Sequence, residues 1–269
     1  MSGITPPRNW RETERATAKG YLDRLAERLA DSVREEYRLQ APIRRERWCR
    51  LAGVTIEWTE MIEEGQYRRS PVAAIIQLRR SWHQTRLNFT LAHELGHHFL
   101  EQSRREPELR RRLGESTVRH LSRVPIGGDD EEQLCNAFAA ALLMPASIAQ
   151  QASRAELRLE AIQTLARCYG MSLSATVVRL QRAGNAPIDY LLCKPTGFGG
   201  WLPRPLTGHD YRYTGSMRLD LDPDCVLPGI VEAELTGSMP MQLTIDAAMK
   251  NRYLHALVLG SKPRRPSIE

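Results

Sequence analysis

The sequence predicts an α+β protein in which helices and a small sheet come first, a helical pair follows, and a small, mainly β module ends the chain. Three observations support this prediction. Apolar residues recur at helical spacing in several early segments, two short β-branched runs interrupt them, and the last third of the chain consists of short apolar runs separated by Gly and Pro. We place the domains at 1–153, 154–186 and 187–269.

The first domain begins with a long amphipathic helix over residues 10–40, in which Leu22, Leu25, Leu29 and Val33 repeat at helical spacing. The runs GVTIEW and VAAIIQL are short, branched and bounded by Gly or Pro, and they predict two strands.

Helical patterns then return in the first domain and continue into the second. We expect one helix over 87–101 and another from about Glu131 to Met144, which Asp129 and Asp130 would cap. Two further helices near 157–168 and 173–183 flank a Gly-containing turn. Beyond them, the runs IDYLLC, IVEAEL, MQLTI and HALVLG predict the strands of the last module.

Composition narrows the class of protein. With 269 residues and 26% charged side chains, the chain is expected to fold into domains with their own cores. No apolar run approaches the roughly 20 residues of a membrane span, and no leader sequence is evident, so we expect a cytoplasmic protein without a membrane partner. The cysteines form no C-x-x-C pair, which argues against a cysteine zinc site.

The segment TRLNFTLAHELGHH carries the clearest chemical motif. On a helix, His93 and His97 lie four residues apart on one face, so both rings can bind one ion. Glu94 then projects beside the open coordination position and can act as a general base toward water. The simpler alternative is a partly buried helix whose histidines only form local hydrogen bonds.

A hydrolytic metal site needs a third protein ligand, and the segment EQLCNAFAAALLMP offers one on the next strong helix. Glu132 and Asn136 share a face, so Glu132 can bind the metal while Asn136 orients a ligand histidine. This order of ligands is that of a gluzincin-like metallopeptidase. Glu131 competes as the ligand on spacing alone, and the acids of the DDEE run could instead only favour the helix N-terminus.

Together, RLNFTLAHELGHHFLE and EQLCNAFAAALLMPAS resemble the ImmA/IrrE family of metallopeptidases. The later segment LARCYGMSLSATVVRLQRAGNAPIDYLLC, with its helix-turn-helix-like part and the following strand, resembles the corresponding part of the radiation-response members of that family in deinococci. The resemblance implies His93, His97 and Glu132 as metal ligands and Glu94 as the catalytic base. The cofactor would be one divalent ion, with Zn²⁺ expected and Mn²⁺ the alternative.

The resemblance also implies a substrate. It would be a small helix-turn-helix repressor of the XRE class, whose cleavage derepresses stress or DNA-damage response genes. We expect a basic surface to dock this substrate, and its arginines precede the histidine motif: Arg68, Arg69, Arg79, Arg80 and Arg86. The side chain that stabilises the oxyanion stays open among four candidates: Tyr67, His83, Arg86 and His98.

Two other functions compete. The segment near 158–184 fits a helix-turn-helix, and Arg179 and Arg182 would contact DNA if its second helix entered a groove. The chain would then be a DNA-binding transcriptional regulator with an inactive peptidase domain. A scaffold role for the same helices is favoured, so DNA is a possible partner but not the preferred one. A peptidase of broad specificity is disfavoured because unrestrained hydrolysis in the cytoplasm would be toxic.

Overall fold

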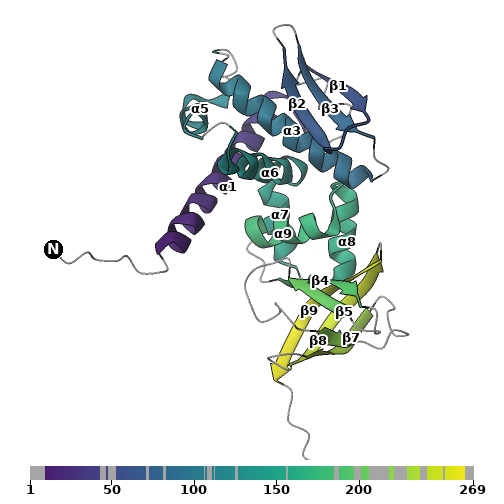
Figure 1. Ribbon diagram of the computed structural model, residues 1–269. Coiled ribbons are helices and arrows are strands. Elements are labelled where there is room, and N and C mark those ends of the chain that lie inside the picture. Colours follow the sequence, from purple (N-terminus) through teal and green to yellow (C-terminus); the bar gives the residue numbers. More distant parts are fainter. Residues whose placement is uncertain are drawn as a thin grey trace, which may run out of the picture. The chain divides into compact units, whose positions relative to one another are not determined.

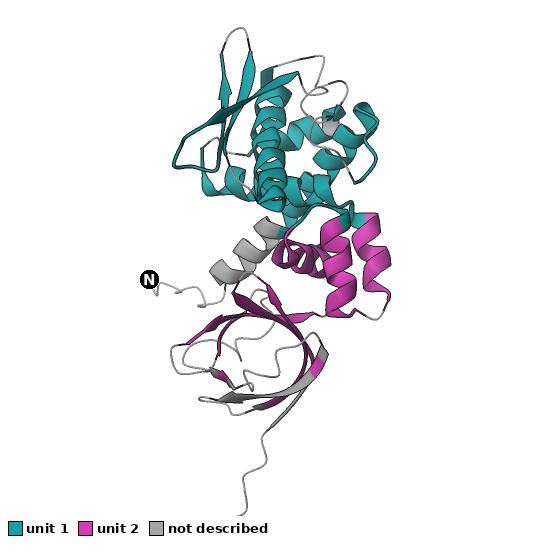
Figure 2. Ribbon diagram, turned by 90° about the vertical axis from the view of Figure 1, so that its right-hand side faces the viewer, with its two compact units in different colours: residues 1–146, 168–171 teal, residues 147–167, 172–269 magenta. Residues whose placement is uncertain are grey.

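The computed structural model describes residues 10–42, 47, 53–70, 73–80, 83–105, 107, 111, 113–124, 127–155, 157–184, 188–196, 201–205, 218–220, 229–236, 241–250 and 252–263. Its contacts define two compact units, which Figure 2 colours separately. Unit 1 comprises residues 1–146 and 168–171, and unit 2 comprises residues 147–167 and 172–269. None of the described helices is long and apolar enough to cross a membrane.

Unit 1 is built on helices α1 (Trp10–Glu36), α3 (Gln84–Arg105), α5 (Glu115–Leu121) and α6 (Asp129–Leu143). Helix α6 packs against both α1 and α3. The predicted apolar stripe of α1 is buried from Leu22 through Val33, and α6 contributes Phe138, whose ring lies edge-on to Phe99 of α3. The strongly periodic helices are therefore present where the sequence predicted them, and burial of their apolar faces holds them together.

A three-stranded sheet lies beside α3 in this unit (Figure 1). Strands β1 (Val54–Thr59) and β3 (Ala74–Arg79) pair in parallel at the two predicted runs, and β2 (Gly65–Arg69) pairs antiparallel with β3. The sequence analysis did not anticipate β2. Its residues, GQYRR, are mostly polar because the strand is at the sheet edge.

The hydrogen bonds around β2 show which of its backbone groups face the free edge. Arg79 N–H donates to Glu64 O, and Ser70 N–H donates to Ala73 O, so the even-numbered residues pair with β3. In an antiparallel ladder the alternate residues point their N–H and C=O groups the other way. Tyr67 therefore directs its N–H away from β3, toward the edge.

Arginines fix the loop that precedes β2. The Arg79 guanidinium donates to Ile62 O at 2.8 Å and pairs with Glu64 at 3.5 Å, and Arg86 also pairs with Glu64. Two arginines of the predicted docking surface thus hold the fold in place, whereas Arg80 is exposed. A charge reversal at Arg79 would disturb this loop and could not report on substrate docking.

The start of α6 differs from the prediction. The helix begins at Asp129, its N-cap is Gly128, and no side chain caps it, so the expected capping by Asp129 and Asp130 is wrong. The side chain that serves this end is Glu131, which accepts the backbone N–H of Gly127 at 2.6 Å. Glu131 can do so because a carboxylate in the first turn can reach back to the preceding backbone.

Unit 2 contains most of α7 (Ala146–Ser153) and α8 (Leu159–Cys168), together with α9 (Leu173–Gly184). Helices α8 and α9 are the predicted pair, and α7 was not foreseen. Asp246 of the following sheet accepts the N–H of Leu159 at 2.7 Å and so caps α8 from a distant part of the sequence.

The rest of unit 2 is an antiparallel sheet that closes on itself, because β4 pairs with both β5 and β9. The strands are β4 (Asp189–Pro195), β5 (Trp201–Pro205), β6 (Arg218–Asp220), β7 (Gly229–Thr236), β8 (Met241–Lys250) and β9 (Tyr253–Pro263). Alternate residues fill its interior, among them Leu191, Cys193 and Ile245. Tyr190 and His255 hydrogen-bond each other in a buried position beside this core.

Burial in α9 bears on the proposed contact with DNA. Arg179 is only 5% exposed. Among the residues of α9, all of which the structure describes, Arg182 alone is exposed. A recognition helix must present a row of side chains to base edges. The helix-turn-helix alternative would use Arg179 as a DNA contact, and in this fold its side chain is buried.

Candidate metal centre

Close packing of α3 against α6 brings the candidate ligands together. Gly96 lies between the two motif histidines, and a Cβ added there would stand 3.2 Å from Cα, Cβ and Sγ of Cys135 on α6. Any larger residue would push the helices apart by a few tenths of an ångström. The glycine of HELGHH thus lets the α6 backbone approach α3 at the level of His93 and His97.

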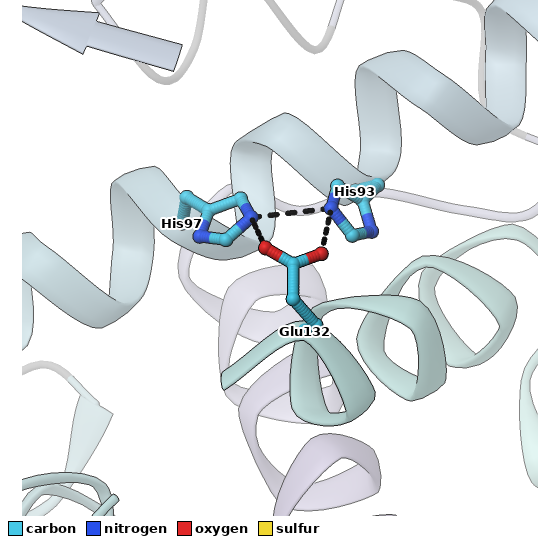
Figure 3. A group of neighbouring side chains, drawn as sticks. All are labelled: His93, His97 and Glu132. Carbon is cyan, nitrogen blue, oxygen red and sulfur yellow. Dashed lines mark hydrogen bonds and ion pairs between the residues drawn. The ribbon is translucent and has the colours of Figure 1, made fainter. Parts of the chain in front are cut away.

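The resulting group is His93, His97 and Glu132, whose ligand atoms all lie within 4.8 Å of one another (Figure 3). The two Nε2 atoms are 3.1 Å apart, and the Glu132 carboxylate oxygens lie 3.3 Å from His93 Nε2 and 3.4 Å from His97 Nε2. Ligand atoms about 2.0–2.1 Å from a tetrahedral zinc ion are separated from one another by about 3.3–3.4 Å. The triangle of donors therefore has the size that a tetrahedral ion requires.

Hydrogen bonds on the far side of each ring define which nitrogen faces the triangle. His93 Nδ1 lies 3.1 Å from Asn136 Oδ1, and His97 Nδ1 lies 2.8 Å from Glu131 Oε1. Both partners are acceptors, and they favour the tautomer with its hydrogen on Nδ1 and a lone pair on Nε2. Two Nε2 lone pairs and the Glu132 carboxylate then face one another with no hydrogen between them. A cation bound at their centre would relieve the repulsion among these three groups.

The two adjacent glutamates consequently have different positions. Glu132 faces the Nε2 atoms, and its side chain is 59% exposed. Glu131 is 8% exposed and bridges His97 Nδ1 and the N–H of Gly127. Glu131 thus fixes the His97 ring from its Nδ1 side, a place that carboxylates commonly occupy around metal-bound histidines.

Glu94 is 7% exposed and lies where the base of such a site belongs. Its Oε2 accepts the edge N–H of Tyr67 at 2.7 Å, which fixes the carboxylate between α3 and β2. Gly65 allows this approach, since a Cβ there would lie 2.4 Å from Thr90 Cγ2 and 3.1 Å from Glu94 Oε1. Burial raises the pKa of Glu94. Burial, followed by the neighbouring His97, lowers the pKa of His93 and favours the neutral, metal-binding ring.

A cleft of about 540 Å³ opens beside these residues. Its lining runs along α3 from His93 to Arg105 and includes Gly65 and Tyr67 of β2 on the opposite wall. An elongated wall between a helix and a strand edge suits an extended segment of polypeptide.

The cleft also narrows the choice of oxyanion-stabilising residue. Tyr67 lines it, whereas Arg86 pairs with Glu64 outside it, and His83 does not line it. His98 is buried, and its Nδ1 lies 3.3 Å from the Tyr67 hydroxyl. Burial and a hydrogen bond to Glu101 raise the pKa of Tyr67, so the phenol keeps its proton and can donate it in a hydrogen bond.

Comparison with known proteins agrees with this chemistry. Residues 53–181 match the family model described as "Peptidase_M78: IrrE N-terminal-like domain", and both the HELGH motif and Glu132 fall inside that range. No curated protein matches the chain.

A solved structure titled "Mycobacterium tuberculosis transcriptional regulator" is 14% identical in sequence. The similarity covers 88% of this chain and 74% of that one, with a TM-score of 0.45. Similarity this low supports no conclusion about function.

Proposed function

We propose, from the membership of residues 53–181 in the ImmA/IrrE family of metallopeptidases, that the chain is a site-specific metalloendopeptidase with His93, His97 and Glu132 as its metal ligands. The observation that carries the proposal is the convergence of three acceptor groups at 3.1–3.4 Å, with both Nδ1 atoms already hydrogen-bonded elsewhere. Zn²⁺ is the expected ion and Mn²⁺ the alternative, because a His, His, Glu set accepts either according to supply.

The residues around the site supply the steps of peptide hydrolysis. A divalent ion held there would provide Lewis acidity and lower the pKa of water. Glu94, fixed by the Tyr67 N–H, takes the proton of the attacking water and delivers it to the leaving amine. The phenol of Tyr67 turns from Glu101 and His98 to donate to the developing oxyanion.

The substrate we propose is a helix-turn-helix repressor of the XRE class, cut to release stress or DNA-damage response genes. Support comes from the family membership of residues 53–181, from the sequence resemblance to radiation-response members of the family, and from a cleft that suits an extended loop. Burial of Arg179 weighs against the alternative of a DNA-binding regulator.

Profiling of new protein N-termini in the native host tests the proposal, with wild type compared with Glu94→Gln before and after DNA damage. We expect one new terminus inside one small repressor, present only with wild type. If the two strains give identical termini under every condition, the peptidase assignment fails. Duplex binding that weakens steeply with salt would then favour the DNA-binding regulator.

A further inference from the structure

The cleft carries charges of opposite sign at its two ends. Glu94 and Glu131 lie beside the proposed ligands His93, His97 and Glu132 at one end, and Arg104 and Arg105 line the other. All the lining residues of α3 fall on one stripe of the helix, so the two ends belong to one continuous surface.

Hydrogen bonds and an ion pair position the two arginines at the basic end of the cleft. The Arg104 guanidinium donates to the backbone oxygens of Leu121 and Val124, where α5 ends, and these bonds hold its position. Arg105 pairs with Glu101 at 3.0 Å, with 64% of the arginine side chain and 26% of the glutamate side chain exposed. Such an exposed i, i+4 pair is weak, so Arg105 can exchange Glu101 for another carboxylate at little cost.

We propose that Arg104 and Arg105 form a subsite for an acidic side chain of the polypeptide substrate, three to four residues from the scissile bond. The spacing follows from helix geometry: Arg105 comes eight residues after His97, which is about 12 Å along the axis. An extended peptide advances about 3.3 Å per residue. The subsite rests on the proposed peptidase function and specifies the substrate that this cleft selects.

Glu101 sets the strength of the subsite. It lies between the two ends, where it pairs with Arg105 and accepts a hydrogen bond from the Tyr67 phenol. A substrate carboxylate must displace Glu101 from Arg105, which keeps the preference for acidic residues moderate. Removal of the Glu101 charge should therefore strengthen the preference, whereas reversal of the Arg105 charge should abolish it.

Cleavage of a peptide library derived from the host proteome tests the subsite, with the full-length protein loaded with Zn²⁺ and the cut sites read by mass spectrometry. Wild type should enrich Asp and Glu at one position three to four residues from the cut. Arg105→Glu should lose this preference and favour Lys or Arg there, with kcat/KM for an acidic peptide lower by roughly tenfold. Glu101→Gln should increase the acidic preference.

Arg28→Glu is the matched control, because it makes the same charge change at an exposed arginine of α1 that neither lines the cleft nor belongs to the predicted docking surface. Its profile should equal that of wild type. If wild type cuts peptides without acidic preference, or if Arg105→Glu leaves the profile unchanged, the subsite is refuted while the peptidase function stands.

A peptide-binding assay tests the subsite independently of peptide hydrolysis. Fluorescence anisotropy of Zn²⁺-loaded Glu94→Gln should show about tenfold tighter binding of an acidic peptide than of its Asn counterpart, and Arg105→Glu in the same background should remove the difference. Should wild type cut nothing, the peptidase proposal fails and this comparison still decides the subsite. Equal binding of the two peptides would overturn it.

Discussion

The adjacent glutamates Glu131 and Glu132 should show opposite patterns when each is replaced by Ala. Glu132 faces both Nε2 atoms and is largely exposed, whereas Glu131 is buried behind His97. Loss of a ligand should weaken zinc binding by more than about a hundredfold. Loss of a group that only orients a ligand should weaken it by about 10- to 100-fold, or roughly 1.4–2.7 kcal/mol.

In the metal-free protein, Glu131→Ala should lower the free energy of unfolding more than Glu132→Ala does. Glu131→Ala leaves the His97 Nδ1–H and the Gly127 N–H without their acceptor in a buried place, which should cost about 1–3 kcal/mol of unfolding free energy. Glu132→Ala removes an exposed carboxylate whose oxygens crowd two imidazole lone pairs, so metal-free stability should hold or rise.

Competition with a chromophoric chelator measures the first quantity, and urea denaturation of the chelator-treated protein measures the second. Glu131→Gln is the control for size, since its amide oxygen can still accept from His97. Zinc affinity that disappears with Glu131→Ala and survives Glu132→Ala would show that the ligand assignment is reversed.

Three further predictions follow from single contacts. Gly96→Ala should force α3 from Cys135 and weaken zinc binding, measured by the same competition, while Ala at exposed Arg80 should not. Tyr67→Phe should lower kcat about 100-fold without loss of zinc; an unchanged kcat would remove Tyr67 from the mechanism. Burial and nearby Lys250 lower the pKa of His255, whose neutral ring can accept from Tyr190. Its folded-state pKa therefore lies below the unfolded value of about 6.5, and stability should fall as pH drops below that value. His255→Gln should flatten this fall in Tm measured between pH 7.5 and 5; an unchanged slope would assign it to other groups.

The grouping of the proposed metal ligands was predictable because the spacing within each helix is local. His93 and His97 share a helix face by spacing, and Asn136 lies one turn after Glu132, so the sequence alone placed these side chains on two facing helices. Local sequence could not decide whether Glu131 or Glu132 is the proposed ligand. The choice depends on where α6 meets α3, and that depends on the contact of Gly96 with Cys135.

Other features escaped the sequence because tertiary contacts decide them. Strand β2 has little apolar pattern and exists through its pairing with β3. Arg79 was expected on a docking surface and instead holds a loop, and Arg179, a DNA contact only in the helix-turn-helix alternative, is buried. A long polar side chain carries no sequence signal that separates these outcomes, since its aliphatic stem can be covered while its charge finds a partner.

The bond between Glu94 and the Tyr67 N–H should also disfavour self-association through the edge of β2. The free edge of β2 exposes backbone groups that could pair with a strand from another copy, and the Glu94 carboxylate covers one of its donors. Glu94→Gln retains an acceptor for that N–H, whereas Glu94→Ala uncovers it and should promote edge-to-edge aggregation. An inactive form for structural or trapping work should therefore carry glutamine at this position.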